Sequence, residues 1–326
     1  MNQILDLLLE SLGGLVFLLL IGGVLLWLGA EWLVKASSSL AGKLGISQMM
    51  IGATVVAFGT SAPEWFVSLR AQMQGFGGLA LGNIIGSNVA NLGLALGLTA
   101  LVRPVKFPPI LLRRELPLVL AAEILFWWLV LDLELSRYDG LALMAGFAAL
   151  YLYLLRASAL GPRAGDHPGE CSRGEPFLKD IVVVVVGLLG LAAGSEVFMR
   201  GAEGIARRFG VARMIIGLTV VAIGTSLPEV ITSVVAALRH RYELSLGNLL
   251  GSNFFNVLFV GGTMTVVRPV DMHPEHLPYV YWMIGITVLL LPLAWIAPRK
   301  RSFGRIAGAV LLITYLSFLF ETVRSS

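Results

Sequence analysis

Residues 59–64 read GTSAPE and residues 224–229 read GTSLPE, each inside a long apolar stretch. A glutamate in hydrocarbon is unfavourable, because a charged side chain at the bilayer centre costs about 2.5 kcal/mol or more. The proline next to the glutamate lacks the amide hydrogen that a continuous helix uses. Two copies of such a motif indicate a functional site rather than two unrelated kinks.

The composition is typical of a polytopic membrane protein. Of the 326 residues, 57% are hydrophobic and 13% are charged, whereas a soluble domain carries roughly 25% charged residues. The pI of about 9.4 then favours basic cytoplasmic loops over nucleic-acid binding. The first ten residues contain Asp6 and Glu10 and no basic residue, unlike a signal or transit peptide. The single cysteine, Cys171, excludes an internal disulfide.

Ten apolar segments are long enough to cross about 30 Å of hydrocarbon as helices. Their expected limits are 13–34, 47–71, 79–101, 115–133, 139–156, 180–200, 212–238, 244–267, 277–297 and 304–322. A polar stretch rich in Gly and Pro separates the first five from the last five. We therefore expect an all-α membrane protein with a first unit at 1–156, a short linker at 157–179 and a second unit at 180–326.

The basic residues predict the orientation in the membrane. With the amino terminus outside, 16 of the 24 Lys and Arg residues fall in cytoplasmic loops, as the positive-inside rule favours. We expect a multi-pass protein of the cell membrane (plasma or inner membrane), with a cytoplasmic linker and both termini outside.

The two halves repeat each other at a constant offset of 165 residues. Residues 51–71 and 216–236 are identical at 13 of 21 positions, and LGNIIGSNVAN (81–91) aligns with LGNLLGSNFFN (246–256). The repeated motifs extend over 51–97 and 216–262. Because the offset contains five spans, an odd number, the two copies have opposite orientations in the membrane. Many secondary transporters are built from such inverted repeats.

The repeated glutamates lie beside helix breakers. Pro63 leaves the carbonyl of Gly59 without its helical partner, and Pro228 does the same to Gly224. Broken helices in a membrane are tolerated where they line a cavity or an ion site. Two carboxylates at one depth repel unless a cation lies between them, and hydroxyls help to reach the roughly 6–8 oxygens that Ca²⁺ prefers. The expected ligands of a hard metal ion are Glu64, Glu229, Thr60 and Thr225.

The second motif supplies uncharged oxygens. Ser87 and Asn91 are four residues apart and share one helical face, and Ser252 and Asn256 repeat that spacing. Such oxygens suit Na⁺ or water. The spacing of Ser87 and Ser252 fits a packing surface equally well, so the motif alone leaves both interpretations open.

Other polar residues are expected to be structural. Asn83 and Asn248 lie on a different helical face from Asn91 and Asn256, and we expect them to have a structural or interfacial role. Glu31 and Glu196 fall near predicted helix ends. Glu123 has no acidic counterpart in the second half. Membrane aromatic residues such as Tyr151 are expected at the interface or facing lipid.

The pair GTSAPE and GTSLPE, each followed by GSN-x-x-N, resembles the α-repeats of the sodium/calcium exchangers in the cation/Ca²⁺ exchanger superfamily. The resemblance covers both repeats. It implies ten helices with an outside amino terminus, and two glutamates that bind Ca²⁺ and Na⁺ alternately.

Position by position, the resemblance implies roles for twelve residues. Glu64 and Glu229 would be the central ligands, and Thr60 and Thr225 would bind Ca²⁺. Ser87, Ser252 and the carbonyls of Ala57 and Ala222 would bind Na⁺. Asn91 and Asn256 would lie at the centre, and Ser61 and Ser226 are weaker candidates. In K⁺-dependent relatives an Asp replaces Asn256, so Asn256 favours K⁺ independence. The short linker predicts a prokaryotic-type exchanger without Ca²⁺-sensing domains.

We therefore expect an antiporter, not an enzyme, that exchanges Na⁺ for Ca²⁺ by alternating access, with the Na⁺ gradient driving Ca²⁺ out. Its expected partners are Na⁺, Ca²⁺ and the lipid bilayer, with no cofactor, no nucleic acid and no obligate protein partner. The main alternative is an exchanger of Ca²⁺, or another divalent cation, for H⁺, because burial favours a protonated carboxylate. A cation channel would carry flux without a counter-ion. An intramembrane enzyme would need a nucleophile and base that the motifs lack.

Overall fold

The computed structural model describes residues 11–108, 111–160, 176–210, 222–300 and 303–325. Its first half contains α2 (Leu12–Leu44), α3 (Gln48–Ile51), the π-helix η1 (Gly52–Val56), α4 (Ala57–Thr60), α5 (Ala62–Met73), α6 (Gly77–Ala90), the π-helix η2 (Asn91–Ala95), α7 (Leu96–Val102), the π-helix η3 (Leu111–Glu115), α8 (Leu116–Leu129), β1 (Glu134–Leu135) and α9 (Arg137–Leu160).

The second half contains α10 (Phe177–Arg208), α12 (Ala222–Thr225), α13 (Leu227–Leu238), α14 (Tyr242–Phe254), the π-helix η5 (Phe255–Val260), α15 (Gly261–Val267), β2 (Val270–Asp271), the 3₁₀-helix η6 (Pro274–His276), α16 (Leu277–Lys300) and α17 (Arg305–Ser325). The strands β1 and β2 pair antiparallel and join the two halves at one end of the bundle.

The prediction of an all-α membrane protein is confirmed. Among the described residues, seven helical segments are long and apolar enough to cross a membrane. The segments α3–α5, η3–α8 and α12–α13 complete ten, five before and five after the predicted linker. The linker residues 161–175 lie outside the described part, so the predicted domain boundaries stay predictions, although α9 and α10 extend into both ends of the 157–179 range.

The first helix of each half is longer than predicted. α2 continues to Leu44 and α10 to Arg208, whereas their expected limits were 34 and 200. Both helices stop where a glycine adopts the left-handed conformation, at Gly45 (φ 67°) and at Gly210 (φ 74°), which lie at the repeat offset. The sequence prediction followed hydrophobicity, which fades before the helical backbone ends.

The longer helices correct the predicted position of two glutamates. Glu31 lies well inside α2 rather than near its end, and its carboxylate is 2.5 Å from the guanidinium of Arg239. Glu196 lies inside α10 and pairs with Arg200 at 2.8 Å. Both ion pairs are at the protein surface, so the structural role expected for these residues fits their surroundings.

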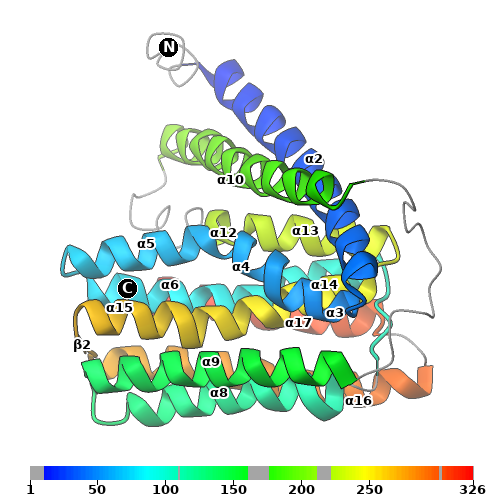
Figure 1. Cartoon of the computed structure of the whole chain (residues 1–326). Helices are drawn as coiled ribbons and strands as arrows, with labels where there is room; N and C mark the ends of the chain where they lie inside the picture. Colours follow the sequence, from blue (N-terminus) through cyan, green and yellow to red (C-terminus); the bar gives the residue numbers. More distant parts are fainter. Residues whose placement is uncertain (1–10, 109–110, 161–175, 211–221, 301–302, 326) are drawn as a thin grey trace.

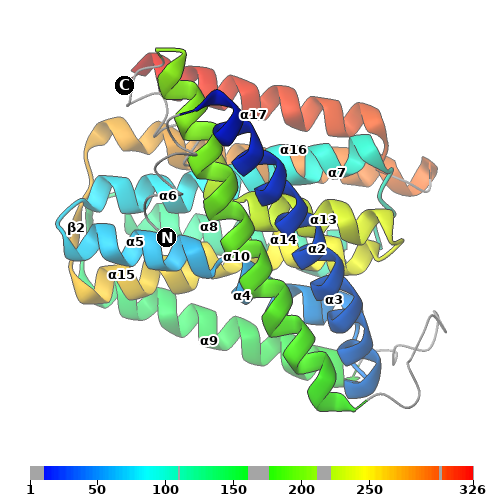
Figure 2. The same ribbon diagram turned by 90° about the horizontal axis from the view of Figure 1, so that it is seen from above.

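α2 and α10 lie side by side and cross the other helices obliquely (Figures 1 and 2). Glycines bring their backbones together: a Cβ on Gly29 would lie 2.8 Å from the carbonyl oxygen of Gly187, and one on Gly194 would lie 2.7 Å from the amide of Leu26. Small residues allow such close approach between membrane helices. Gly29 and Gly194 are equivalent in the two repeats, so the pseudo-two-fold axis passes between the two helices.

The helices α6–α7 and α14–α15 form the interior. In each of these two segments, 78% of the most apolar 18-residue window is buried, against 33% for α2 and 28% for α10. Both interior segments contain a π-helix, η2 and η5, at equivalent positions. The GSN motifs therefore lie at the centre of the protein, where α6 and α14 face the broken segments α4–α5 and α12–α13.

The α2–α10 interface yields a test on two adjacent glycines of one helix. A Cβ on Gly22 would lie 2.6 Å from the backbone nitrogen of Phe198, whereas a Cβ on Gly23 meets nothing within 4 Å. Gly22→Ala should lower the thermal unfolding temperature in detergent, because overpacking typically costs about 1–3 kcal/mol. Gly23→Ala should leave that temperature unchanged or raise it, since alanine favours helix. Equal effects of the two substitutions would contradict the close packing of α2 on α10.

Candidate ion-binding site

The helix break predicted at each GTS-x-PE motif is confirmed. Ser61 separates α4 from α5 with φ −87° and ψ 5°, and Ser226 separates α12 from α13 with φ −86° and ψ 0°. Pro63 and Pro228 occupy the first turn of the new helix, where a missing amide hydrogen has no helical acceptor to lose. The two breaks therefore share one geometry.

Glu64 and Glu229 lie in the first turn of α5 and α13 and are 1% and 0% exposed. A helix amino terminus carries a partial positive charge that favours a carboxylate there. The two carboxylates are close enough to repel each other electrostatically. Among the described residues, neither forms an ion pair with a basic side chain.

The serines at the helix breaks cross between the repeats. The Ser61 hydroxyl donates to Oε1 of Glu229 at 2.7 Å, and the Ser226 hydroxyl donates to Oε1 of Glu64 at 3.4 Å. The second oxygen, Oε2, of each glutamate has no hydrogen-bond partner among the described residues. The weaker candidates of the sequence analysis thus contact the glutamates directly, each the one of the opposite repeat.

The serines of the GSN motifs are both buried, yet they differ in their contacts. The Ser252 hydroxyl donates to Oε1 of Glu229 at 3.5 Å. The Ser87 hydroxyl has no partner among the described residues. Although the two serines are equivalent in the repeats, only Ser252 bonds to the glutamate of its own repeat.

The last asparagines of the motifs also present unpaired polar atoms. Nδ2 of Asn91 donates to Oδ1 of Asn253 at 3.0 Å, while Oδ1 of Asn91 and both polar atoms of Asn256 lack partners among the described residues. Buried polar atoms in native proteins are nearly always paired, so unpaired ones require a ligand, an ion or water. The interior therefore holds several buried oxygens that suit a hard cation.

The remaining predicted ligands lie on the same broken segments. Thr60 and Thr225 are buried, and the Thr60 hydroxyl lies 3.1 Å from Oδ1 of Asn248 and contacts the Glu229 carboxylate. The carbonyl of Ala57 accepts from the amide of Ser61 at 3.0 Å and faces the Thr60 hydroxyl at 3.4 Å. Ala222 begins α12, and the preceding residues 211–221 lie outside the described part.

Asn83 and Asn248 support the glutamates, a role that sequence reasoning missed. Nδ2 of Asn83 donates to the carbonyl of Glu64 at 3.1 Å, and Nδ2 of Asn248 donates to that of Glu229 at 3.4 Å. The same nitrogens bond Ser68 at 2.8 Å and Ser233 at 3.0 Å. They are structural, as expected, but they fasten α5 to α6 and α13 to α14 at the glutamates. Their repetition at the 165-residue offset was the available signal.

Tyr151 corrects another expectation. It was expected at the interface or facing lipid, but its hydroxyl donates to the carbonyl of Ala53 at 2.9 Å, within the π-helix that precedes Ala57. Hydrophobicity alone does not show which face of α9 meets the protein. Glu123, in contrast, is buried between α8 and α16 and accepts from the Thr287 hydroxyl at 3.0 Å.

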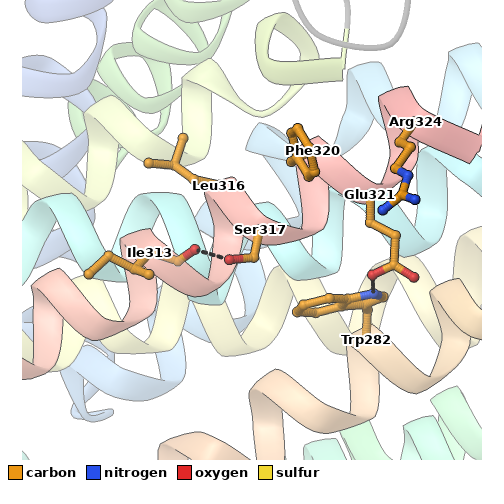
Figure 3. A pocket seen from close by; sticks show the side chains of 7 residues that line it. All are labelled: Trp282, Ile313, Leu316, Ser317, Phe320, Glu321 and Arg324. Atoms are coloured by element: carbon orange, nitrogen blue, oxygen red, sulfur yellow. Dashed lines mark hydrogen bonds between the residues drawn. The ribbon is translucent and has the colours of Figure 1, made fainter.

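An open groove lies between α16 and α17, where the Trp282 indole donates to Glu321 at 2.9 Å (Figure 3). Leu316 and Phe320 in its wall are exposed, as expected for side chains that face lipid. The groove contains none of the predicted ligands. The candidate site is therefore the buried cluster around Glu64 and Glu229.

Comparisons with known proteins agree with this architecture. A family model described as sodium/calcium exchanger protein matches residues 14–156 and 179–323. The putative antiporter CaxA of Alkalimonas amylolytica is 36% identical over 308 residues, covering 92% of this chain and 96% of the relative. The sodium/calcium exchanger MaX1 of Methanosarcina acetivorans is 31% identical, with 93% and 96% covered.

A solved structure shows the same fold. The sodium-calcium exchanger NCX_Mj, in crystals soaked with 2.5 mM Na⁺ and 0.1 mM Ca²⁺, has a TM-score of 0.79 at 29% identity over 93% of this chain and 96% of that chain. With the family model matching both halves, this chain belongs to the sodium/calcium exchanger family of membrane transporters.

Proposed function

We propose that this protein is an antiporter that exchanges Na⁺ for Ca²⁺ at a single site around Glu64 and Glu229. The observation that carries the proposal is the pair of buried carboxylates, one from each repeat, with no basic partner among the described residues. A buried negative charge requires a cation or a proton. The name of one relative, the sodium/calcium exchanger MaX1, and the Na⁺- and Ca²⁺-soaked structural neighbour support these ions as the cargo.

The ligand assignment follows from the chemistry of each oxygen. Carboxylates are hard ligands that suit Ca²⁺, and hydroxyls and amide oxygens coordinate Na⁺ without adding negative charge. Ca²⁺ would be held by Glu64, Glu229, Thr60 and Thr225, and Na⁺ by the same glutamates with Ser87, Ser252, Asn91, Asn256 and the carbonyls of Ala57 and Ala222. Ser61 and Ser226 would orient the carboxylates of the opposite repeat.

Competition for the glutamates couples the two fluxes. When both carboxylates are ionised, the empty site carries two negative charges, which resist the occlusion that a change of access requires. Ca²⁺, or several Na⁺ ions, removes that charge and allows the change. Binding of one cargo thus expels the other, and the inward Na⁺ gradient would drive Ca²⁺ out of the cell.

Coupling to Na⁺ is favoured over coupling to H⁺ by the unpaired neutral oxygens. Within the described part of the chain, Oγ of Ser87 and Oδ1 of Asn91 are buried acceptors without partners, and a protonated carboxylate alone would not need them. A Ca²⁺/H⁺ exchanger is the competing function, because two adjacent buried carboxylates can also be neutralised by protons.

The flux experiment uses purified protein in liposomes loaded with Na⁺ and diluted into Na⁺-free buffer containing radioactive Ca²⁺. Uptake should require internal Na⁺ and fall to the level of empty liposomes in Glu64→Gln. Glu123→Gln is the matched control, because Glu123 is equally buried but contacts Thr287 instead. Uptake driven by a proton gradient alone would assign H⁺ coupling, and uptake indifferent to both gradients would indicate a channel.

Cation binding should also stabilise the folded protein. At a Ca²⁺ concentration of about 100 times the dissociation constant, one site adds about 2.7 kcal/mol to the free energy of unfolding. Thermal unfolding in detergent should therefore shift upward with Ca²⁺ in the wild type and in Glu123→Gln. The shift should be largely lost in Glu229→Gln. A shift retained by Glu229→Gln would place Ca²⁺ elsewhere.

The proposed orientation puts the linker in the cytoplasm and both termini outside the cell membrane. Cys171 is the single cysteine and belongs to the predicted linker. A membrane-impermeant maleimide should label it only after intact cells are permeabilised. Labelling of Cys171 in intact cells would reverse the orientation, while leaving the inverted relation of the two repeats unchanged.

A further inference from the structure

Two asparagines that the proposed ligand set does not include meet across the pseudo-two-fold axis. Nδ2 of Asn88 donates to the carbonyl of Asn253 at 3.3 Å, and Nδ2 of Asn253 donates to the carbonyl of Asn88 at 3.4 Å. Both side chains are buried, on α6 and α14. They are the third residues of the two GSN motifs, 165 positions apart.

These reciprocal bonds fix the direction of both amides. A backbone carbonyl can only accept, so the atom facing it in each side chain must be the nitrogen. Oδ1 of Asn88 and Oδ1 of Asn253 are therefore available to accept from other donors. The orientation of each amide follows from its partners and needs no separate assignment.

Oδ1 of Asn253 in turn fixes the amide of Asn91. It accepts from Nδ2 of Asn91 at 3.0 Å, which directs Oδ1 of Asn91 away from Asn253, where it is buried without a partner among the described residues. A flipped Asn91 would place two oxygens against each other and present its NH₂ group instead. Because an NH₂ group repels a cation, this bond keeps the Asn91 side chain in the form that can serve as a ligand.

The equivalent bond in the other half is not made. The counterpart of the Asn91–Asn253 bond is one from Asn256 to Asn88. Oδ1 of Asn88 and both polar atoms of Asn256 are instead buried without partners among the described residues. The first motif thus makes this asparagine bond and its copy does not, although both share the pattern GSN-x-x-N and both have a π-helix at the last asparagine. π-Helical turns are frequent where a helix must rearrange locally.

We propose that Asn88 and Asn253 are positioning residues that alternately orient the two ligand asparagines during the transport cycle. In the conformation described here Asn253 holds Asn91. In the conformation with exchanged repeats, Nδ2 of Asn256 donates to Oδ1 of Asn88, and Asn91 is released. This inference rests on the proposed exchange function and adds to it the residues that set the ligand geometry on each face of the membrane.

A double-mutant cycle tests whether Asn253 acts through Asn91. Purified Asn253→Ala, Asn91→Ala and the double variant are titrated with Ca²⁺, and bound Ca²⁺ is then displaced with Na⁺. Asn253→Ala should weaken binding of at least one of the two ions about fivefold, the effect of one hydrogen bond. The same substitution should add less than about twofold in the Asn91→Ala background. If the two substitutions instead weakened ion binding independently, so that the double variant showed the product of the two single effects, the proposal would be overturned.

A second readout separates positioning from general damage to the fold. KM for Ca²⁺ is measured at each face of liposomes with oriented protein. Asn253→Ala and Asn88→Ala should raise KM at opposite faces, with kcat changed less than KM. Thr99→Val is the control, because it removes a buried hydroxyl bond, 2.7 Å to the carbonyl of Ala95, outside this network. If both asparagine variants raised KM at the same face, or lowered kcat without changing KM, the two asparagines would not act in alternate conformations.

The outcomes distinguish this inference from the proposed function. A wild type that exchanges Na⁺ for Ca²⁺, with unchanged ion binding in Asn253→Ala and Asn88→Ala, would refute the positioning role and leave the exchanger intact. A wild type whose Ca²⁺ uptake ignores the Na⁺ gradient would refute the exchange function. In that case the binding cycle alone still shows whether Asn253 orients Asn91.

Discussion

The structure depends on two like charges held together in the interior of a membrane protein. Glu64 and Glu229 repel each other, and no basic side chain among the described residues neutralises either one. The surroundings offset part of that repulsion through the amino termini of α5 and α13 and through the crossed bonds from Ser61 and Ser226. Any charge that remains on the two carboxylates needs a cation or a proton.

Inverted symmetry explains how one motif can build both sides of such a site. A two-fold axis in the membrane plane places equivalent residues opposite each other, as the reciprocal bonds of Asn88 and Asn253 and the glycine contacts of α2 and α10 show. Each repeat alone offers one carboxylate at the end of a broken helix. The two carboxylates of the candidate site therefore come from different repeats.

The two repeats also differ from each other in several contacts of the candidate site. Ser61 is 2.7 Å from Glu229 but Ser226 is 3.4 Å from Glu64, and Ser252 contacts its glutamate while Ser87 does not. Both halves have the same residue types at these positions. If the two repeats exchanged their conformations, each of these contacts would be replaced by the equivalent contact of the other repeat. Under the proposed alternating access, the free energies of the two states would then be close. Not every contact has an equivalent, because the counterparts of the surface pair Glu31–Arg239 are Glu196 and Gln74.

The sequence by itself determined the membrane class, the ten segments, the repeat, the helix breaks and the buried polar motifs, because each follows from hydrophobicity, an exact offset or a proline. Only the tertiary structure decided which atoms meet. It showed that Tyr151 bonds to a π-helix, that Asn83 and Asn248 fasten the glutamate helices, and that Asn253 bonds to Asn91, whereas Asn256 has no partner among the residues that the structure describes. Spacing along a chain is the same in both repeats, whereas hydrogen bonds depend on distances between helices, and those differ between the two halves.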